Sequence, residues 1–277
     1  MNKDTLIIGG VLFLIITGLI IFYNMKETLE EGYDFEIHFF NAGKADAILL
    51  SKDNKYIMID TGEEDLAYDI LKYFQEKNIT RLEYLIITHF DKDHVGSASQ
   101  IIDSIEIGKV LQSNVSKESE YYTNYVNSLQ KKNITPLTIS NNKEFSLSNL
   151  SIVVNGPGKK YDSNQSNNSS LIVSIIHEKN KFLFMGDSQN ARIKDFLENN
   201  KETYNFLKVP YHGRTLKRLE ELVSTKNIKY AVITSSNTEK ESEETLEVLK
   251  KYNIKTYLTR KGSITVLSNG SNIKIKQ

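Results

Sequence analysis

The sequence predicts an α/β protein in which two β-sheets pack face to face and helices cover their outer faces, an αββα sandwich of four layers. Two observations predict this fold. Short apolar strands fall into two groups along the chain, and helical segments are interleaved with the strands of each group. Helices placed in this way cover the outer faces of the sheets, which bury their inner faces against each other.

The elements of the first group follow from apolar periodicity. Leu66, Ile70, Leu71 and Phe74 recur at helical spacing, whereas short, mostly apolar runs between turn residues indicate strands. The expected strands are 35–40, 47–51, 56–60, 82–88 and 109–112, and the expected helices are 66–77, 95–103 and 118–132.

The second group also interleaves strands with helices, but its sequence does not repeat that of the first group. Residues 171–177 and 181–185 are expected to form a hairpin, and residues 156–168 a long polar loop. The expected strands are 134–139, 144–147, 151–155, 171–177, 181–185, 206–209, 230–234, 256–258, 264–267 and 272–276, and the expected helices are 191–199, 216–224 and 243–251.

Residues 5–23 contain no charged side chain, and about 20 apolar residues in a helix span a bilayer. The run is longer than the apolar part of a secretory signal and lacks a small-residue cleavage site, which favours an uncleaved anchor over a signal peptide. We expect a flank at 1–4, a transmembrane anchor at 5–23, a linker at 24–34 and a folded domain at 35–277. A slight bias in flanking lysines favours a single-pass protein of the cell membrane with its domain outside the cell.

Composition excludes several classes of function. The chain has 35 basic and 35 acidic residues, so no net charge attracts it to nucleic acid or lipid. It has no cysteine, which excludes disulfides, thiolate metal ligands and thiol catalysis.

The strongest functional signal follows the expected strand at 82–88. Four side chains that can bind a metal, His89, Asp91, Asp93 and His94, fall within six positions, and the whole chain has only 5 histidines. A metal site needs nitrogen and oxygen donors that converge within about 2–2.5 Å of one point. A polar loop without metal is the plainer alternative, but the density of donors favours a metal site.

Three further side chains end apolar strands or follow them closely. Asp60 is followed two residues later by Gly62, Asp187 directly follows Gly186, and His212 lies in a short loop between Pro210 and Gly213. Asp60 could bind a metal or accept the second N–H of a metal-bound histidine. Asp187 could bridge two cations, and His212 could complete the set. Each piece alone is also consistent with an ordinary turn or surface loop.

The order of these pieces resembles the metallo-β-lactamase superfamily, whose signature is His-x-His-x-Asp-His, then Asp or Cys, then His. Here the signature reads His-x-Asp-x-Asp-His, a variant that resembles the hydrolase domain of the DNA-uptake protein ComEC and its free-standing relatives. Three stretches resemble further motifs of that group: 38–47, 168–173 and 207–213. The resemblance covers residues 35–268.

The resemblance implies two divalent ions, Mn²⁺ or Zn²⁺, about 3.5–4 Å apart. His89 and Asp91 would bind one ion, Asp93, His94 and His212 the other, and Asp187 would bridge them. Asp93 and Asp187 would be central to catalysis, with Asp46 and Asp60 supporting the ligands. The predicted contacts to substrate are Asn168, Ser170, Lys208 and Arg214. The plainer interpretation of Lys208 and Arg214 is a solvated helix start.

The implied activity is hydrolysis of a phosphodiester by a metal-activated hydroxide, with DNA as a candidate substrate and a second chain supplying the pore in any transport role. An esterase acting on phosphorylcholine of cell-wall polymers is an alternative on the same fold. A non-catalytic scaffold is another, because Lys44, Ala45 and Tyr211 depart from the pattern.

Overall fold

The computed structural model describes residues 17–18, 32–159 and 161–277, and residues 34–277 form one compact unit. Within those ranges no helix combines the length and apolar character that crossing a bilayer needs. The predicted anchor at 5–23 lies outside the described residues except for Thr17 and Gly18.

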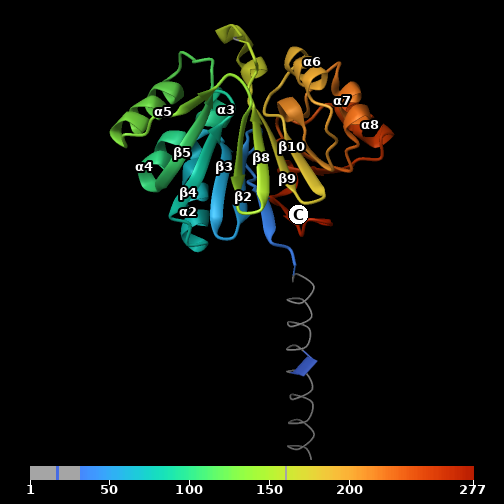
Figure 1. The fold of residues 1–277 in the computed structure, drawn as a ribbon, viewed down its shortest axis with the longest axis horizontal. Helices are drawn as coiled ribbons and strands as arrows, with labels where there is room; N and C mark the ends of the chain where they lie inside the picture. Colours follow the sequence, from blue (N-terminus) through green and yellow to red (C-terminus); the bar gives the residue numbers. More distant parts are fainter. Residues whose placement is uncertain (1–16, 19–31, 160) are drawn as a thin grey trace, which may run out of the picture. The chain divides into compact units, whose positions relative to one another are not determined.

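The unit contains two sheets, in agreement with the predicted fold class (Figure 1). In sheet order, the first consists of β15 (Ile273–Lys276), β14 (Ile264–Ser268), β1 (Phe35–Phe39), β2 (Ala47–Lys52), β3 (Lys55–Thr61), β4 (Arg81–Ile87), β5 (Glu106–Ser113) and β6 (Leu137–Ile139). The second consists of β13 (Lys255–Leu258), β12 (Tyr230–Ile233), β11 (Phe206–Lys208), β10 (Asn180–Phe184), β9 (Ile172–His177), β8 (Leu150–Asn155) and β7 (Lys143–Leu147).

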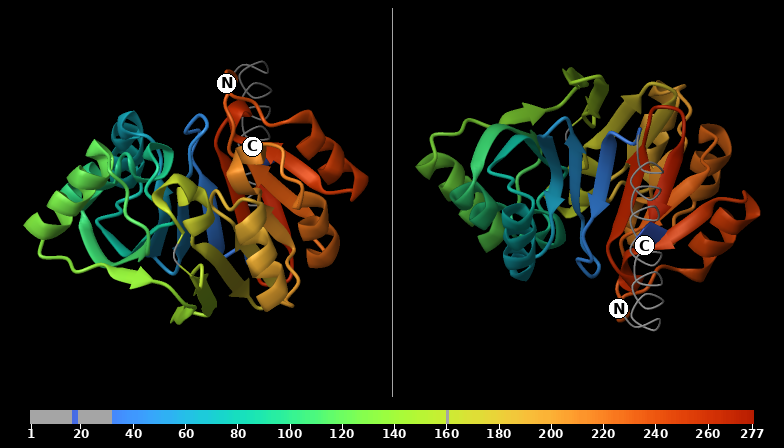
Figure 2. Two further views of the ribbon diagram at one scale, coloured as in Figure 1. Left: turned by 90° about the horizontal axis from the view of Figure 1, so that it is seen from above. Right: turned by 90° about the horizontal axis from the view of Figure 1, so that it is seen from below.

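The helices lie on the outer faces of the two sheets (Figures 1 and 2). The first sheet is covered by α2 (Ala67–Glu76), α4 (Ala98–Ser104) and α5 (Glu120–Lys131), and the second by α6 (Asn190–Asn199), α7 (Leu219–Lys226) and α8 (Glu243–Lys251). Between the sheets, the ring of Phe39 on β1 lies 5.9 Å from that of Phe206 on β11 and 6.3 Å from that of Phe184 on β10. Burial of these aromatic rings joins the two sheets into one core.

Local sequence explains where several elements start and turn. The hydroxyls of Ser119 and Ser242 accept backbone N–H groups at the starts of α5 and α8, as helix N-caps do. The β2–β3 hairpin turns through Asp53 and Asn54, which both have positive φ, a conformation that Asp and Asn tolerate well.

The helix expected at 95–103 is interrupted. A short helix, α3 (Lys92–Val95), comes first, and α4 starts at Ala98. Asp93 and His94 are therefore helical residues rather than loop residues. The loop expected at 156–168 contains a 3₁₀ segment, η2 (Ser163–Ser169).

The direction of the strands places the site. β3, β4 and β5 are parallel neighbours in the first sheet, and β10, β11 and β12 are parallel neighbours in the second. Parallel strands present their carboxyl ends at one edge, where α/β proteins commonly bind ligands. Residues that follow β4, β10 and β11 therefore gather at these edges.

Candidate metal centre

Four donor side chains meet between the two sheets. Asp93 and His94 come from α3, Asp187 follows β10, and His212 lies in the 3₁₀ segment η3 (Pro210–Gly213) after β11. One ligand atom of each lies within 4.8 Å of those of the other three. Asp187 Oδ1 is 3.1 Å from His212 Nε2 and 3.3 Å from His94 Nε2, and His212 Nε2 is 3.4 Å from Asp93 Oδ2.

The centre contains buried polar atoms that lack partners. In the described part of the chain, five buried side-chain atoms have no hydrogen-bond partner, and four of them are His89 Nε2, His94 Nε2, Asp187 Oδ1 and His212 Nε2. An unpaired buried polar atom costs free energy, and divalent cations bound at the centre would relieve this cost. This donor set fits a metal ion.

His94 is oriented by Asp60, at the end of β3. The Asp60 carboxylate accepts from the backbone N–H and the hydroxyl of Thr88, each at 2.7 Å, and lies 2.8 Å from His94 Nδ1. A proton held on Nδ1 leaves the Nε2 lone pair directed into the centre, as in metal-bound histidines supported by a carboxylate.

His212 is oriented in a similar way by Thr234. Its Nδ1 lies 2.9 Å from the Thr234 hydroxyl oxygen and 3.1 Å from the Thr234 carbonyl oxygen. Tyr211 and His212 both have positive φ, a strained conformation for residues other than glycine, which persists where surrounding contacts hold it. The backbone here is bent to bring His212 into the centre.

Asp60→Asn is expected to weaken divalent-cation binding about 10–100-fold, because His94 would lose its anionic partner. Asn tolerates the positive φ of Asp60, so the backbone should remain intact. Calorimetric titration with Mn²⁺ and Zn²⁺ measures the effect, with Asp69→Asn on the exposed side of α2 as the matched control. Unchanged affinity in Asp60→Asn would contradict this role.

Charges in the centre support one another. Burial opposes ionisation of Asp187, but cationic His212 and His94 outweigh it and hold the pKa of Asp187 well below its ordinary value. Burial likewise opposes protonation of His94, but Asp187 and Asp60 raise its pKa well above the ordinary value. By contrast, burial and the nearby charge of His94 lower the pKa of His89. The two carboxylates thus favour the protonated form of His94.

Cation affinity is expected to rise with pH. The pKa of His94 and the pKa of His212 are both raised by nearby carboxylates against the effect of burial, so both imidazoles bind protons that a metal must displace. Each proton released makes affinity increase about tenfold per pH unit below that pKa. Titrations between pH 6 and pH 8, in buffers of different ionisation enthalpy, report both affinity and proton release, and pH-independent affinity would contradict the expectation.

His89 and Asp91 form a second part of the centre. The His89 ring lies 4.1 Å from that of His94, and His89 Nε2 lies 3.8 Å from Asp91 Oδ1. Asp91 also accepts from Lys117 Nζ at 2.6 Å and from the Ser166 hydroxyl at 2.7 Å, so its charge is partly compensated. His89 and Asp91 therefore lie beside the group of four donors but are not members of it.

The structure changes the interpretation of Lys208. The sequence predicts a contact to substrate, whereas Lys208 is 0% exposed, forms an ion pair with Asp46 and donates to the Gly186 carbonyl at 3.2 Å. Its ammonium is therefore a structural cation inside the core. Asp46 also accepts the Thr234 hydroxyl at 2.7 Å, and that hydroxyl oxygen lies 2.9 Å from His212 Nδ1.

The other predicted substrate contacts lie at different places. Arg214 is exposed, pairs with Glu239 at 3.0 Å and lies over the Tyr211 ring. Ser170 accepts the backbone N–H of Asp187 at 3.1 Å, and Asn168 accepts the backbone N–H of Arg192 at 3.3 Å. Ser170 and Asn168 are both buried, so in this structure they position backbone around the centre.

Sequence reasoning missed a cation at the centre. Lys44 Nζ lies 3.4 Å from Asp93 Oδ2 and 3.8 Å from Glu239 Oε1. Lys44 departs from the motif that residues 38–47 resemble, but no pattern in the sequence shows that its ammonium reaches Asp93.

Two histidines lie away from the centre. His177, expected to be exposed, is 1% exposed and its Nδ1 lies 2.9 Å from the Ser268 hydroxyl oxygen, because β14 packs beside its hairpin. His38, expected to be structural, stacks on Tyr73 with ring centroids 4.6 Å apart, and burial lowers its pKa to about 4.

Two helix-covered sheets thus bring histidines and aspartates together near the carboxyl ends of their parallel strands, an arrangement that fits a divalent cation. The chain belongs to the metallo-beta-lactamase superfamily, whose family model matches residues 41–235.

Individual related proteins share limited sequence identity with this chain. The chain is 24% identical over 206 residues to Recombination protein 2 of Haemophilus influenzae, which covers 73% of this chain and 24% of that relative. This match fits the resemblance to ComEC-type proteins, and the chain spans less than two thirds of that relative's length.

Solved structures share the fold. The metallo-beta-lactamase fold protein YhfI from Bacillus subtilis has a TM-score of 0.55 at 9% identity, covering 88% of this chain and 100% of that one. A provisionally assigned metal-dependent hydrolase from Parabacteroides distasonis has a TM-score of 0.53 at 14% identity, covering 82% and 93% of the two chains.

Proposed function

We propose that this member of the superfamily hydrolyses phosphodiester bonds with a pair of divalent cations, Mn²⁺ or Zn²⁺. The observation that carries the proposal is the convergence of Asp93, His94, Asp187 and His212 from three separate segments on one buried point. His89 and Asp91 beside them provide donors for a second cation.

The donor set favours this substrate class. Aspartates stand beside the imidazoles, and oxygen donors favour hard cations such as Mn²⁺ more than a purely imidazole site would. A bound divalent cation supplies Lewis acidity that activates water near neutral pH and stabilises negative charge on a phosphoryl group. The chain itself holds the donors in place: Asp60 orients His94, Thr234 orients His212, and Ser170 positions the backbone of Asp187.

A panel of substrates tests the proposal. The purified full-length chain, stripped of metal and reloaded with Mn²⁺ or Zn²⁺, is assayed on bis(p-nitrophenyl) phosphate, single-stranded and duplex DNA, a phosphorylcholine ester and a β-lactam. Cation-dependent cleavage of diesters is the expected result, and DNA cleavage would identify a nuclease. Cleavage of the phosphorylcholine ester alone would favour the cell-wall esterase, and β-lactam cleavage without diester cleavage would overturn the proposal.

A non-catalytic scaffold is the second candidate, and Lys44 favours it. The Lys44 ammonium 3.4 Å from Asp93 Oδ2 places positive charge of the chain where cations would bind. Metal content separates the two candidates. Two ions per chain at neutral pH would support the enzyme, whereas fewer than one would support the scaffold.

Lys44→Gln is expected to increase divalent-cation affinity about tenfold, because removing a nearby positive charge reduces its repulsion of the metal. Calorimetric titration of both proteins measures the effect. Lys92→Gln, an exposed lysine on α3 that pairs with Glu63, is the matched control. Equal affinity in Lys44→Gln and wild type would show that the Lys44 ammonium moves away when a cation binds.

Membrane attachment through residues 5–23 remains part of the proposal, with the domain outside the cell and any pore for transport supplied by a partner chain. Because the chain has no cysteine, Tyr68→Cys offers one reactive thiol at a side chain that is 73% exposed. Labelling of intact cells by an impermeant maleimide would support the outside location, and labelling only after lysis would contradict it.

A further inference from the structure

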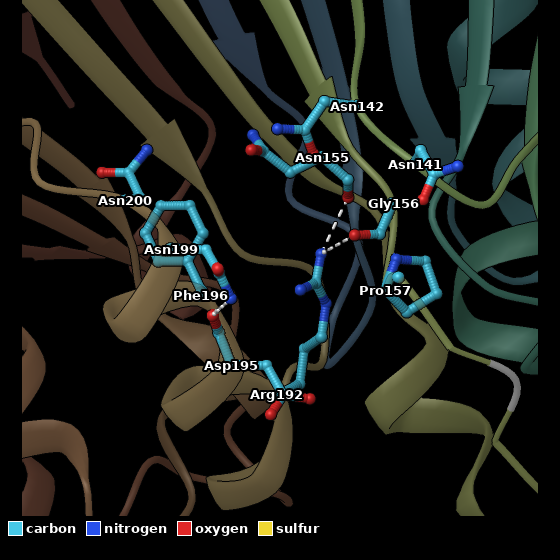
Figure 3. Close-up of a pocket in the computed structure, with 11 residues that line it drawn as sticks. Asn141, Asn142, Asn155, Gly156, Pro157, Arg192, Asp195, Phe196, Asn199 and Asn200 are labelled. Atoms are coloured by element: carbon cyan, nitrogen blue, oxygen red, sulfur yellow. Dashed lines mark hydrogen bonds between the residues drawn. The ribbon is translucent and has the colours of Figure 1, made fainter.

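A cavity lies beside α6, separate from the metal centre. It encloses about 500 Å³, within the range of sites for small ligands. Figure 3 shows the residues that line it. They include Asn141, Asn142, Asn155, Arg192, Asp195 and Phe196.

Arg192 is held rigidly at this cavity. It is 3% exposed, its Nε donates to the Ser170 carbonyl at 3.2 Å, and its Nη2 donates to the carbonyls of Asn155 and Gly156 at 2.8 and 3.0 Å. The third guanidinium nitrogen, Nη1, faces the open space toward Phe196 (Figure 3). The part of the chain that the structure describes offers Nη1 no acceptor, so a donor is available to a ligand.

The charge of Arg192 lacks a direct counterion. No carboxylate in the described ranges forms an ion pair with it. Asp195, the acidic residue of the cavity wall, already accepts Lys159 Nζ at 2.8 Å and the Tyr161 hydroxyl at 2.7 Å. Burial lowers the pKa of Arg192 to about 10, so the guanidinium stays protonated at neutral pH. A buried cation of this kind favours an anionic ligand.

The cavity has polar groups at its rim, and one residue connects its wall to the metal centre. Asn141 and Asn142 are exposed at the rim, where their amides can bind ligand oxygens. Ser170 connects the two sites, because its carbonyl accepts from Arg192 and its hydroxyl accepts the backbone N–H of Asp187. The same residue therefore contacts both the cavity wall and the metal centre.

We infer that the Arg192 cavity binds a non-reacting phosphate group of a polyanionic substrate whose scissile phosphodiester lies at the metal centre. The inference rests on the proposed function for the identity of the substrate, while the binding of phosphate to the cavity can be tested without catalysis. Arg192 would bind the phosphate through Nη1, and the asparagines would add neutral hydrogen bonds.

The first experiment measures binding of tripolyphosphate by calorimetry to metal-free protein kept in chelator. Asn142→Asp adds negative charge at the rim and is expected to weaken binding about fivefold. Asn124→Asp, on the exposed surface of α5, should bind as wild type does. Arg192→Gln removes the charge and should reduce binding at least as much, with circular dichroism showing whether that variant is folded.

The second experiment compares a single-stranded oligonucleotide with bis(p-nitrophenyl) phosphate in the metal-loaded protein. For each protein, the KM for the oligonucleotide is divided by the KM for the small diester. This ratio should be about fivefold higher in Asn142→Asp than in wild type. Weaker tripolyphosphate binding in Asn142→Asp supports phosphate binding in the cavity even where no diester is cleaved. Failure of the proposed hydrolysis can therefore be distinguished from failure of this inference. Binding equal to wild type in folded Asn142→Asp overturns the inference even where diesters are cleaved.

Discussion

Asp187→Asn should lower cation-dependent kcat by a factor on the order of 10³. The side chain follows β10, is buried, and its Oδ1 lies 3.3 Å from His94 Nε2 and 3.1 Å from His212 Nε2. An amide has nearly the same shape but lacks the charge that binds and bridges cations. The loss should therefore reflect chemistry at the centre rather than unfolding.

Three measurements separate these causes: kcat at saturating Mn²⁺, metal content by mass spectrometry, and thermal unfolding by circular dichroism. Asp103→Asn is the matched control, since that carboxylate pairs with Lys131 on the helical surface. A folded Asp187→Asn protein with fewer bound ions and little activity is the expected result. Activity within about tenfold of wild type would be inconsistent with the assigned role of Asp187.

Lys208→Met should reduce the free energy of unfolding by about 3–5 kcal/mol, because it leaves the buried Asp46 carboxylate without its cationic partner. Burial opposes ionisation of Asp46, but Lys208, His212 and His94 lower its pKa, so Asp46 is charged in the folded protein. Methionine fills a similar volume, which keeps the loss of packing small.

Denaturant unfolding of four proteins measures this interaction: wild type, Lys208→Met, Asp46→Asn and the double variant. The double variant should be more stable than Lys208→Met, since the neutral amide that replaces the Asp46 carboxylate no longer needs a cation while it still accepts the Thr234 hydroxyl. Equal stability of Lys208→Met and wild type would mean that Asp46 is neutral or solvated.

Much of the fold could be predicted because its elements are locally encoded. Apolar periodicity indicates β4 and α2, and the hairpin of β9 and β10 lies where the turn residues predict it. The donors at 89–94 follow an apolar strand, and parallel strands bring such ends together.

The surroundings of the centre could not be predicted in the same way. Lys208 belongs to a charged residue class that is usually exposed, and its burial depends on partners distant in the chain, chiefly Asp46 and the Gly186 carbonyl. The contact of Lys44 with Asp93 and the burial of His177 against Ser268 also depend on tertiary packing. Local sequence therefore does not predict such pairings.

Asp93 and His94 extend from the first sheet through α3, while Asp187 and His212 follow strands of the second. A cation held by all four would link residues that follow strands of both sheets. Because only the folded chain brings these donors together, the binding free energy of the cation would add to the stability that the packed core already provides.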